Sequence, residues 1–234
     1  MREGGPSPPG PGGGAVLAGQ RVLPAPIPLA PLLPGAGIRR GGLVGVSGDG
    51  GTTLVLSLLV EPLAQGSWAA VVGMPELGLE AAAAMGVDLA RVALVPRPGP
   101  SWAAVVAVLL DALDLVVVSP PGRCRPADAR RLLARAKERG SVLCVTGPEG
   151  WPESPELVLV AETEGWEGLD IGAGTLRARR GRIVVSGRRG AGRPVVVPCW
   201  LPGPDGRLAA RRSGSPKAAP ERVPDEPEAM PWAG

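Results

Sequence analysis

The stretch Gly45-Val46-Ser47-Gly48-Asp49-Gly50-Gly51-Thr52-Thr53 decides the fold of this chain. It has the G-x-x-x-x-G-K-[ST] spacing of a phosphate-binding loop. In such a loop, backbone N–H groups at a helix N-terminus cradle phosphate oxygens, a lysine reaches the β and γ phosphates, and a hydroxyl holds magnesium. Gly45, Gly50 and Thr52 keep this spacing, but Gly51 stands where the lysine belongs. The stretch therefore predicts a strand, a loop and a helix that lack the main charge of a nucleotide site.

Outward from the loop, short apolar runs alternate with helical patterns as far as residue 146. Strands are expected at 43–47, 68–73, 91–95, 114–118 and 141–146, and helices at 52–60, 76–85, 102–113 and 127–139. Ser101 is a candidate N-cap, Pro126 suits a first helical turn, and Gly86 and Gly140 are stop signals. Strands that alternate with helices predict βαβ units, and hence an α/β fold with a mostly parallel sheet covered on both faces.

The flanking segments have a different composition. Residues 1–20 are Gly/Pro-rich and residues 207–234 are rich in Pro, Ala and charge, so both are expected to be disordered around one core domain at 21–206. Prolines within 22–34 favour an extended arm along the edge of the core, followed by a turn at 35–42. Short strands at 157–161, 175–180, 182–186 and 195–201 are expected to form an antiparallel extension of the sheet.

The composition excludes several kinds of site. The chain has no histidine, which rules out Ser-His-Asp and Cys-His catalysis and removes the commonest metal ligand. Its three cysteines are scattered, which is typical of a reduced cytoplasmic protein, and no metal site is expected. No secretory signal or membrane-spanning run is found. The formal net charge of +3 permits contact with nucleic acid without requiring it.

Three segments resemble the RecA recombinase core. They are Gly35-Ala36-Gly37-Ile38-Arg39-Arg40-Gly41 leading into the loop, Met85-Gly86-Val87-Asp88-Leu89 followed by residues 92–99, and Leu113-Asp114-Leu115-Val116-Val117-Val118-Ser119. The resemblance implies a RecA-like three-layer fold. Its active groups do not carry over, because the loop lysine falls on Gly51, the Walker B aspartate on Ser119 and the catalytic glutamate on Met74. We therefore expect no enzymatic activity.

The loop itself leaves two interpretations open. Its candidate nucleotide-binding residues are Gly45, Gly48, Gly50, Gly51, Thr52 and Thr53. They either still bind ATP through backbone N–H groups or form a vestigial turn between strand and helix. Loss of the lysine removes a charge-assisted phosphate contact, and loss of the magnesium-linked acid leaves the phosphate charge poorly neutralised. The vestigial turn is favoured, with no cofactor expected.

A short, degenerate RecA-like core is similar to the actinobacterial ImuA-like accessory proteins of the damage-inducible mutasome. The similarity includes residues 75–79, 166–169 and 200–206. It implies a non-catalytic adaptor in the DNA-damage (SOS) response that supports translesion synthesis, with an ImuB-like Y-family polymerase homologue, an error-prone polymerase or RecA as partners and a nucleoid-associated location. The alternatives are an ATP- and DNA-dependent RecA-type ATPase and a SulA-like cell-division inhibitor.

Arginines and one tryptophan are the candidate contacts to DNA or a partner. They are Arg123, Arg125, Arg131 and Arg135 around one helix, Arg177, Arg179, Arg182, Arg188 and Arg189 in the C-terminal hairpins, and Trp232 in the tail. Arginine suits bidentate phosphate contact, whereas the alternative is a solvated face. The hairpin cluster has few acids near it in sequence, which favours a binding surface. Trp151 and Trp166 are expected to be exposed interface anchors.

Overall fold

The strand, loop and helix expected at the opening motif are present in the computed structural model, which describes residues 22–170, 173–187 and 191–211. Leu43–Ser47 forms strand β3 and Gly51–Ala64 forms helix α1. The helix is longer than the 52–60 expected, because it continues through Pro62 in its last turn. The loop between the two elements comprises only residues 48–50, as in a phosphate-binding loop.

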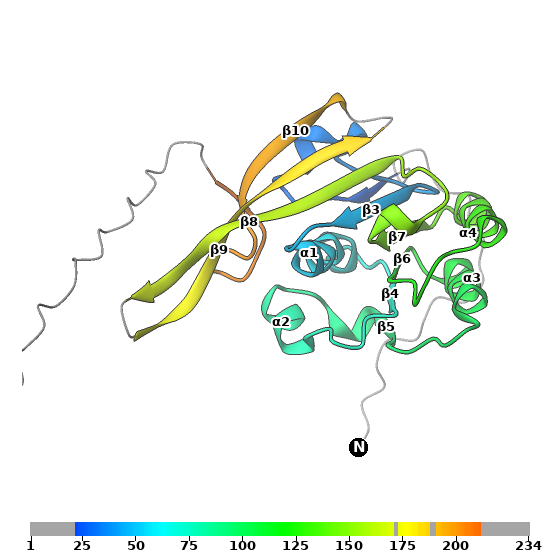
Figure 1. Cartoon of the computed structure of the whole chain (residues 1–234), viewed down its shortest axis with the longest axis horizontal. Coiled ribbons are helices and arrows are strands. Elements are labelled where there is room, and N and C mark those ends of the chain that lie inside the picture. The colour runs from blue at the N-terminus through cyan, green and yellow to red at the C-terminus, as the bar shows by residue number, and fades with distance from the viewer. Residues whose placement is uncertain (1–21, 171–172, 188–190, 212–234) are drawn as a thin grey trace, which may run out of the picture.

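A parallel sheet with crossover helices surrounds this unit (Figure 1). The further strands are β4 (Ala69–Val72), β5 (Val92–Val95), β6 (Leu115–Val118) and β7 (Val142–Thr146), and the helices are α2 (Leu79–Ala84), α3 (Trp102–Ala112) and α4 (Pro126–Arg139). Neighbouring strands follow the order β3-β7-β6-β4-β5, all parallel. The predicted α/β class is confirmed.

The helix boundaries follow local signals in most places. Pro126 opens α4, and Gly140 closes it in the left-handed conformation at φ 70°. Gly86 follows α2 at φ 93°. Ser101 occupies the N-cap position of α3, but its hydroxyl makes no capping hydrogen bond.

An antiparallel ribbon extends the sheet beyond β3. It consists of β8 (Leu157–Asp170), β9 (Ala173–Gly187), β10 (Ala191–Trp200) and β11 (Ala209–Ala210). Strand β8 is parallel to β3 but antiparallel to β9, so it joins the two halves of the sheet. The expected division at 175–180 and 182–186 was wrong: Gly181 lies inside one strand, where a Cβ would come 2.6 Å from the Glu162 carbonyl oxygen.

The N-terminal arm is more structured than expected. Val22–Pro24 (β1) pairs with Gly37–Arg39 (β2), and two 3-10 turns, Ala30–Leu32 and Pro34–Ala36, join them. The expected extended arm and turn are therefore a small hairpin. Its connection buries Leu29 completely.

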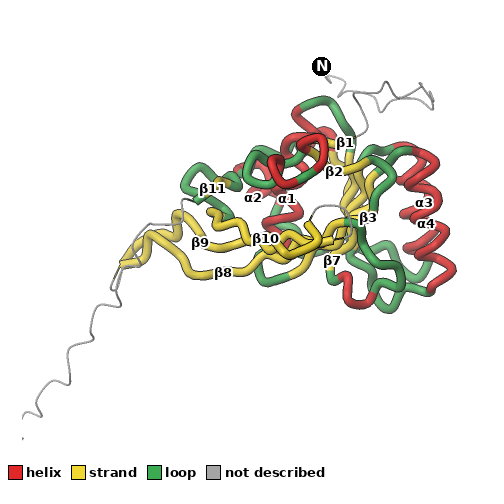
Figure 2. The backbone as a smooth tube through the Cα atoms, turned by 90° about the horizontal axis from the view of Figure 1, so that it is seen from above, coloured by secondary structure: helices red, strands yellow, loops and turns green. Residues whose placement is uncertain are grey.

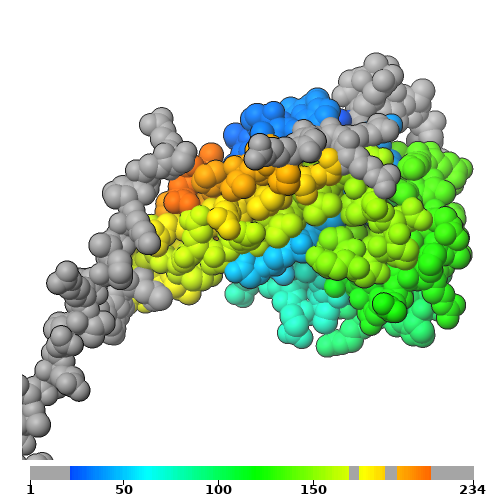
Figure 3. Space-filling model, turned by 45° about the horizontal axis from the view of Figure 1, so that its top comes forward, coloured from blue at the N-terminus to red at the C-terminus, as the bar shows by residue number. Residues whose placement is uncertain are grey.

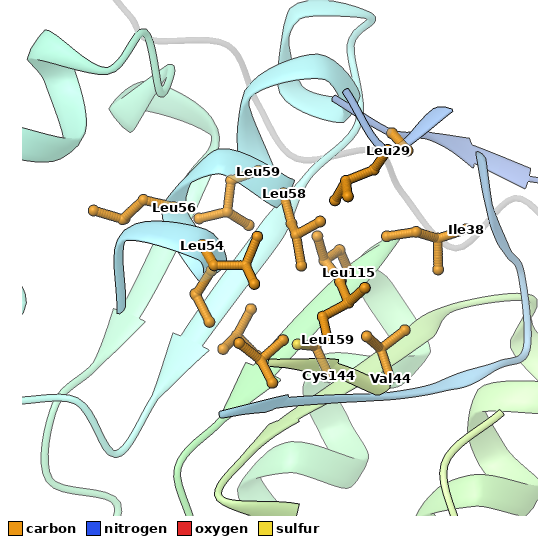
Figure 4. Packing of buried hydrophobic residues seen from close by; sticks show 14 of the residues in the cluster. Leu29, Ile38, Val44, Leu54, Leu56, Leu58, Leu59, Leu115, Cys144 and Leu159 are labelled. Atoms are coloured by element: carbon orange, nitrogen blue, oxygen red, sulfur yellow. The ribbon is translucent and has the colours of Figure 1, made fainter. Parts of the chain in front are cut away.

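Helices lie on both sides of the parallel half of the sheet (Figure 2), and a hydrophobic core fills each of the two interfaces. Helix α1 and the N-terminal hairpin cover one face, where Leu54, Leu58 and Leu59 meet Val44 and Leu159 (Figure 4). Helices α3 and α4 cover β4, β6 and β7 on the other face. This arrangement places the loop after β3 at the carboxyl edge of the parallel strands.

The expected tail boundary at residue 206 falls inside a hairpin, because β11 pairs with β10 and extends the sheet almost to Arg211. The segments 1–20 and 212–234, both expected to be disordered, lie outside the described residues, apart from 207–211. Among the helices that the structure describes, none is both long and apolar enough to cross a bilayer. In the same residues, no three His, Cys, Asp or Glu side chains form a metal-binding group.

Candidate functional site

Three positions that hold charge in the resembled family lie at one edge of the sheet. Gly51 follows β3, Met74 follows β4 and Ser119 follows β6, and parallel strands present their carboxyl ends at the same edge. Met74 packs against the core on the α1 side. The Ser119 amide donates to the Val72 carbonyl oxygen over 2.9 Å. These three positions carry neither an ammonium nor a carboxylate group.

The loop glycines accommodate the backbone of strand β8. Gly48 has φ 92°, and a Cβ there would lie 2.0 Å from the Ala161 carbonyl oxygen. The Gly50 amide donates to that same oxygen over 3.3 Å. The Asp49 carboxylate accepts a hydrogen bond from the Thr163 amide over 2.9 Å. The Gly51 amide donates to the Gly48 carbonyl oxygen over 3.0 Å, so the N–H groups of both Gly50 and Gly51 are bound to protein. Strand β8 is fastened to the loop at two points.

Arg179 of β9 adds a third contact between the antiparallel ribbon and the loop region, at Thr53. Its Nη2 donates to Thr53 Oγ1 over 2.8 Å, and its Nε donates to the Leu201 carbonyl oxygen. The guanidinium stacks over the Trp166 ring at 5.3 Å. Burial lowers the pKa of Arg179, and the Asp49 charge opposes this shift. The Arg179 guanidinium is therefore a positive charge beside the loop, and it is hydrogen-bonded to oxygen atoms of the protein itself.

Sequence reasoning placed Arg179 on a contact surface and missed this role. The usable signal is strand alternation, because Arg179 shares the face of β9 that carries the buried Ile183 and Val185. A long strand through Gly181 would have placed the arginine on the same side as α1. The division of β9 into two strands concealed that relation.

The other hairpin arginines face glutamates of the neighbouring strand. Arg182 pairs with Glu162 at 2.5 Å, while Arg180 lies 3.7 Å from Glu167. The cluster has few acids near it in sequence, but β8 supplies acids that are distant in sequence and adjacent in register. Arg177 is exposed and has no ion pair within the described ranges. Arg188, Arg189 and Trp232 lie outside the described residues.

Helix α4 is also largely neutralised on the side that faces α3. Arg135 donates to both Asp111 oxygens at 2.6 Å, and Arg139 reaches the same carboxylate at 3.1 Å. The hydrogen bond from Arg135 is the main reason why the pKa of Asp111 lies below its ordinary value. Arg131 lies 3.5 Å from Asp128. Of the four arginines predicted here, Arg123 and Arg125 are exposed without an ion pair among the residues described.

The two tryptophans expected as anchors have different environments. Trp166 is 43% exposed, as predicted. Trp151 is buried at 7% exposure and packs on Trp102 with ring centroids 6.2 Å apart, so that prediction was wrong. The Gly/Pro-rich segment that carries Trp151 folds onto β3, where Pro148 would lie 2.8 Å from a Cβ on Gly45. Gly45 is thus required by packing.

The chain has an α/β fold of the RecA type. It is similar to the RadB recombinase structure, with a TM-score of 0.58 over 80% of this chain and 97% of that chain, at 19% identity. A KaiC-like protein, PH0186 from Pyrococcus horikoshii OT3, aligns with a TM-score of 0.56 over 82% of this chain and 99% of that one, at 16% identity. At these identities the likeness concerns the fold alone.

The chain belongs to the family described as MT3502 N-terminal domain, whose model matches residues 31–153. It is also 42% identical over 135 residues to an uncharacterized protein, Rv3395c, of Mycobacterium tuberculosis (strain ATCC 25618 / H37Rv). That match covers 57% of this chain and 61% of the relative. The chain therefore spans less than two thirds of the length of this relative.

Proposed function

We propose that this chain is a non-catalytic RecA-like adaptor of the DNA-damage response, which supports translesion synthesis and induced mutagenesis through protein contacts. Its partners in this proposal are an ImuB-like Y-family polymerase homologue, an error-prone polymerase or RecA. The observation that carries the proposal is the closed loop, where Arg179 and the β8 backbone contact the residues that would surround a phosphate.

Charge arguments support the absence of catalysis in this proposal. Phosphoryl transfer depends on cations and a magnesium-binding acid that neutralise the phosphate charge. Gly51 and Ser119 supply neither group, and the guanidinium of Arg179 is already bonded to Thr53 and Leu201. A nucleotide would have to compete for the arginine with protein acceptors. ATP binding and turnover are therefore not part of the proposed function.

The open edge of the sheet supports a protein-binding role. Strand β5 ends the strand order, so one side of its backbone has no partner strand in the described part of the chain. Leu94 on β5 is 39% exposed, and Leu79 and Leu89 on the preceding segments are 40% and 37% exposed. An open strand edge with apolar side chains is a template for pairing with another chain. We place the principal partner contact at this edge.

The test is co-purification of the tagged full chain with each of the three partners expressed separately. Leu94→Asp is expected to reduce recovery of the true partner, whereas Val108→Asp, at a 67% exposed position on α3, serves as the matched control. Deletion of the gene is expected to lower damage-induced mutation frequency. Absence of both effects would refute the adaptor.

The two alternative functions give different results in the same strains. A RecA-type ATPase would hydrolyse ATP faster with single-stranded DNA and lose that activity in Thr52→Ala. A SulA-like inhibitor would cause filamentation on expression without changing mutation frequency. If DNA is bound directly, retardation should fall steeply with salt and depend on Arg123 and Arg125, which are not ion-paired among the described residues.

A further inference from the structure

The antiparallel ribbon has one face that belongs to neither hydrophobic core. Side chains alternate along β8, β9 and β10, and those directed toward α1, such as Leu159, Ile183 and Cys199, are completely buried. On the opposite side, six apolar residues are partly exposed, among them Val196 at 51%, and charged residues such as Glu162 and Arg182 lie beside them. We call this set the outer sheet face: Val158, Val160, Val184, Val196, Pro198 and Trp200.

The helical layer on this side stops before the ribbon. Helices α3 and α4 cover β4, β6 and β7, and the segment with Pro148 and Pro155 ends the cover at Gly45 of β3. In the views of Figure 1 and Figure 3, no described element lies in front of β8, β9 and β10. A sheet of this fold is normally buried on both faces. The outer sheet face therefore lacks the layer that the rest of the sheet possesses.

We propose that the C-terminal segment, residues 212–234, packs on the outer sheet face of its own chain. The segment begins at the edge of this surface: the Arg211 amide donates to the Pro198 carbonyl oxygen over 3.0 Å, and the Arg211 guanidinium bonds to Glu164. A polyproline segment rises about 3.1 Å per residue. Strands are spaced about 4.8 Å apart, so the segment is long enough to cross all three strands several times.

The composition of the segment fits this surface. It has prolines at 216, 220, 224, 227 and 231, with Met230 and Trp232 near its end. Polyproline chains need no backbone hydrogen bonds from a partner and bind aromatic and apolar grooves. The outer sheet face offers Trp200 and Pro198 beside valines, while its strands are already paired with one another. Met230 and Trp232 would supply the apolar anchors that cover the valines.

Charge supports the same assignment. Glu221, Asp225, Glu226 and Glu228 make residues 221–234 acidic, with Arg222 as the single basic residue of that stretch. Arg182 on β9 is 51% exposed at the side chain and borders the outer sheet face beside its partner Glu162. Arg182 can pair with one carboxylate of the segment in addition to Glu162, and the other acids would stay in water at the rim of the face. The proposal is independent of the adaptor function.

Trypsin digestion of the full chain tests the proposal, because Lys217 and Arg222 lie within the segment. Release of the C-terminal fragment is followed by mass spectrometry. Cleavage is expected to accelerate about tenfold in the Met230→Ala/Trp232→Ala variant, which corresponds to a loss of 1.4 kcal/mol of docking free energy. Val196→Asp, on the outer sheet face, should also accelerate cleavage. Val108→Asp, on α3, should leave the cleavage rate unchanged.

The tail variant keeps the test valid if Val196→Asp fails to fold, since residues 230 and 232 lie outside the described sheet. Equal cleavage rates in the wild type and the tail variant would overturn the proposal. So would protection that rises with protein concentration together with a dimer in sedimentation, because a second copy would then cover the face. Fast cleavage of the isolated wild-type chain that slows only with an added partner would likewise overturn it.

Discussion

At the scale of single residues, Arg179 is the side chain whose removal tests the closed loop most directly. Arg179→Ala removes hydrogen bonds to Thr53 and to the Leu201 carbonyl oxygen, together with the stack on Trp166. We expect the free energy of unfolding to fall by about 2 kcal/mol, the range for hydrogen bonds to charged groups. Urea unfolding followed by circular dichroism measures this change.

Arg177→Ala is the matched control for that measurement. Arg177 lies on the same strand, but it is exposed and has no ion pair in the described part of β8 and β9. We expect a change within about 0.5 kcal/mol, as for ordinary surface substitutions. Equal midpoints for both variants would mean that Arg179 does not fasten the ribbon to the loop.

Two loop glycines are expected to respond oppositely to the same substitution. Gly48→Ala places a Cβ 2.0 Å from the Ala161 carbonyl oxygen at φ 92°, so we expect a loss of at least about 2 kcal/mol from backbone strain and displacement of β8. Gly51→Ala meets nothing closer than Val46 at 4.0 Å, in the first turn of α1. It should stabilise the chain by about 0.5 kcal/mol.

The comparison of these two variants tests whether glycine is required at positions 48 and 51 for packing or for phosphate binding. Differential scanning calorimetry on both, with and without ATP, gives the result. If the loop is a packing junction, the melting temperatures should move in opposite directions and ATP should change neither. A loop kept for phosphate would instead show a wild-type melting temperature that rises with ATP and an effect of ATP that is lost in Gly48→Ala.

At the scale of elements, the sequence predicted best where the signals are local. The βαβ half follows from continuous apolar strands and from stop signals such as Gly86 and Gly140, each within a few residues of the element it bounds. The ribbon was predicted less well, because its properties depend on register. Glu162 and Arg182 meet only once β8 and β9 are paired, and Gly181 resembles a break until its neighbours are known.

In the candidate site too, features that depend on residue identity could be predicted, whereas contacts between distant segments could not. The absence of charge at Gly51, Met74 and Ser119 could be inferred from the chain, because it concerns residue identity. The closure by Arg179 could not, since it joins segments far apart in sequence. Trp151 was misjudged for a related reason: its polar, Gly/Pro-rich neighbours are typical of a surface loop, yet the loop packs its ring on Trp102.

The contact between α3 and α4 provides a pH prediction. Asp111 accepts hydrogen bonds from Arg135 and Arg139, and its pKa in the folded chain lies below the ordinary value of 3.8. A lowered pKa means that the stabilisation is complete above the ordinary value and is lost as pH falls through it toward the folded value. Asp111→Asn should therefore be less stable than the wild type at neutral pH, and this difference should vanish in acid.

The measurement is urea unfolding of both chains from pH 7 to pH 2.5, at low and high salt. Because Arg135 and Arg139 are substantially exposed, the difference at neutral pH should shrink as salt screens the pair. Asp128→Asn is a suitable control, since its ion pair with Arg131 is longer, at 3.5 Å. A difference that persists unchanged in acid would show that Asp111 acts through packing instead.

At the scale of the whole molecule, the fold joins a RecA-like sheet to a ribbon that contacts the loop at the carboxyl edge of that sheet. In this arrangement β8, Arg179 and Leu201 contact the loop that would hold a phosphate. A ligand that binds only the native state raises its stability in proportion to the logarithm of ligand concentration over Kd. We therefore expect millimolar ATP with magnesium to leave the melting temperature of the full chain unchanged.

Differential scanning fluorimetry of the wild type, Thr52→Ala and Gly51→Lys tests this expectation with a built-in comparison. Thr52 is exposed, so its substitution should leave the fold intact. Gly51→Lys restores the missing cation at a position with room for a side chain, but Ser119 still supplies no acid for magnesium. The melting temperature of each of the three chains should be the same with and without nucleotide. A rise in the melting temperature of the wild type that disappears in Thr52→Ala would show that the loop still holds phosphate.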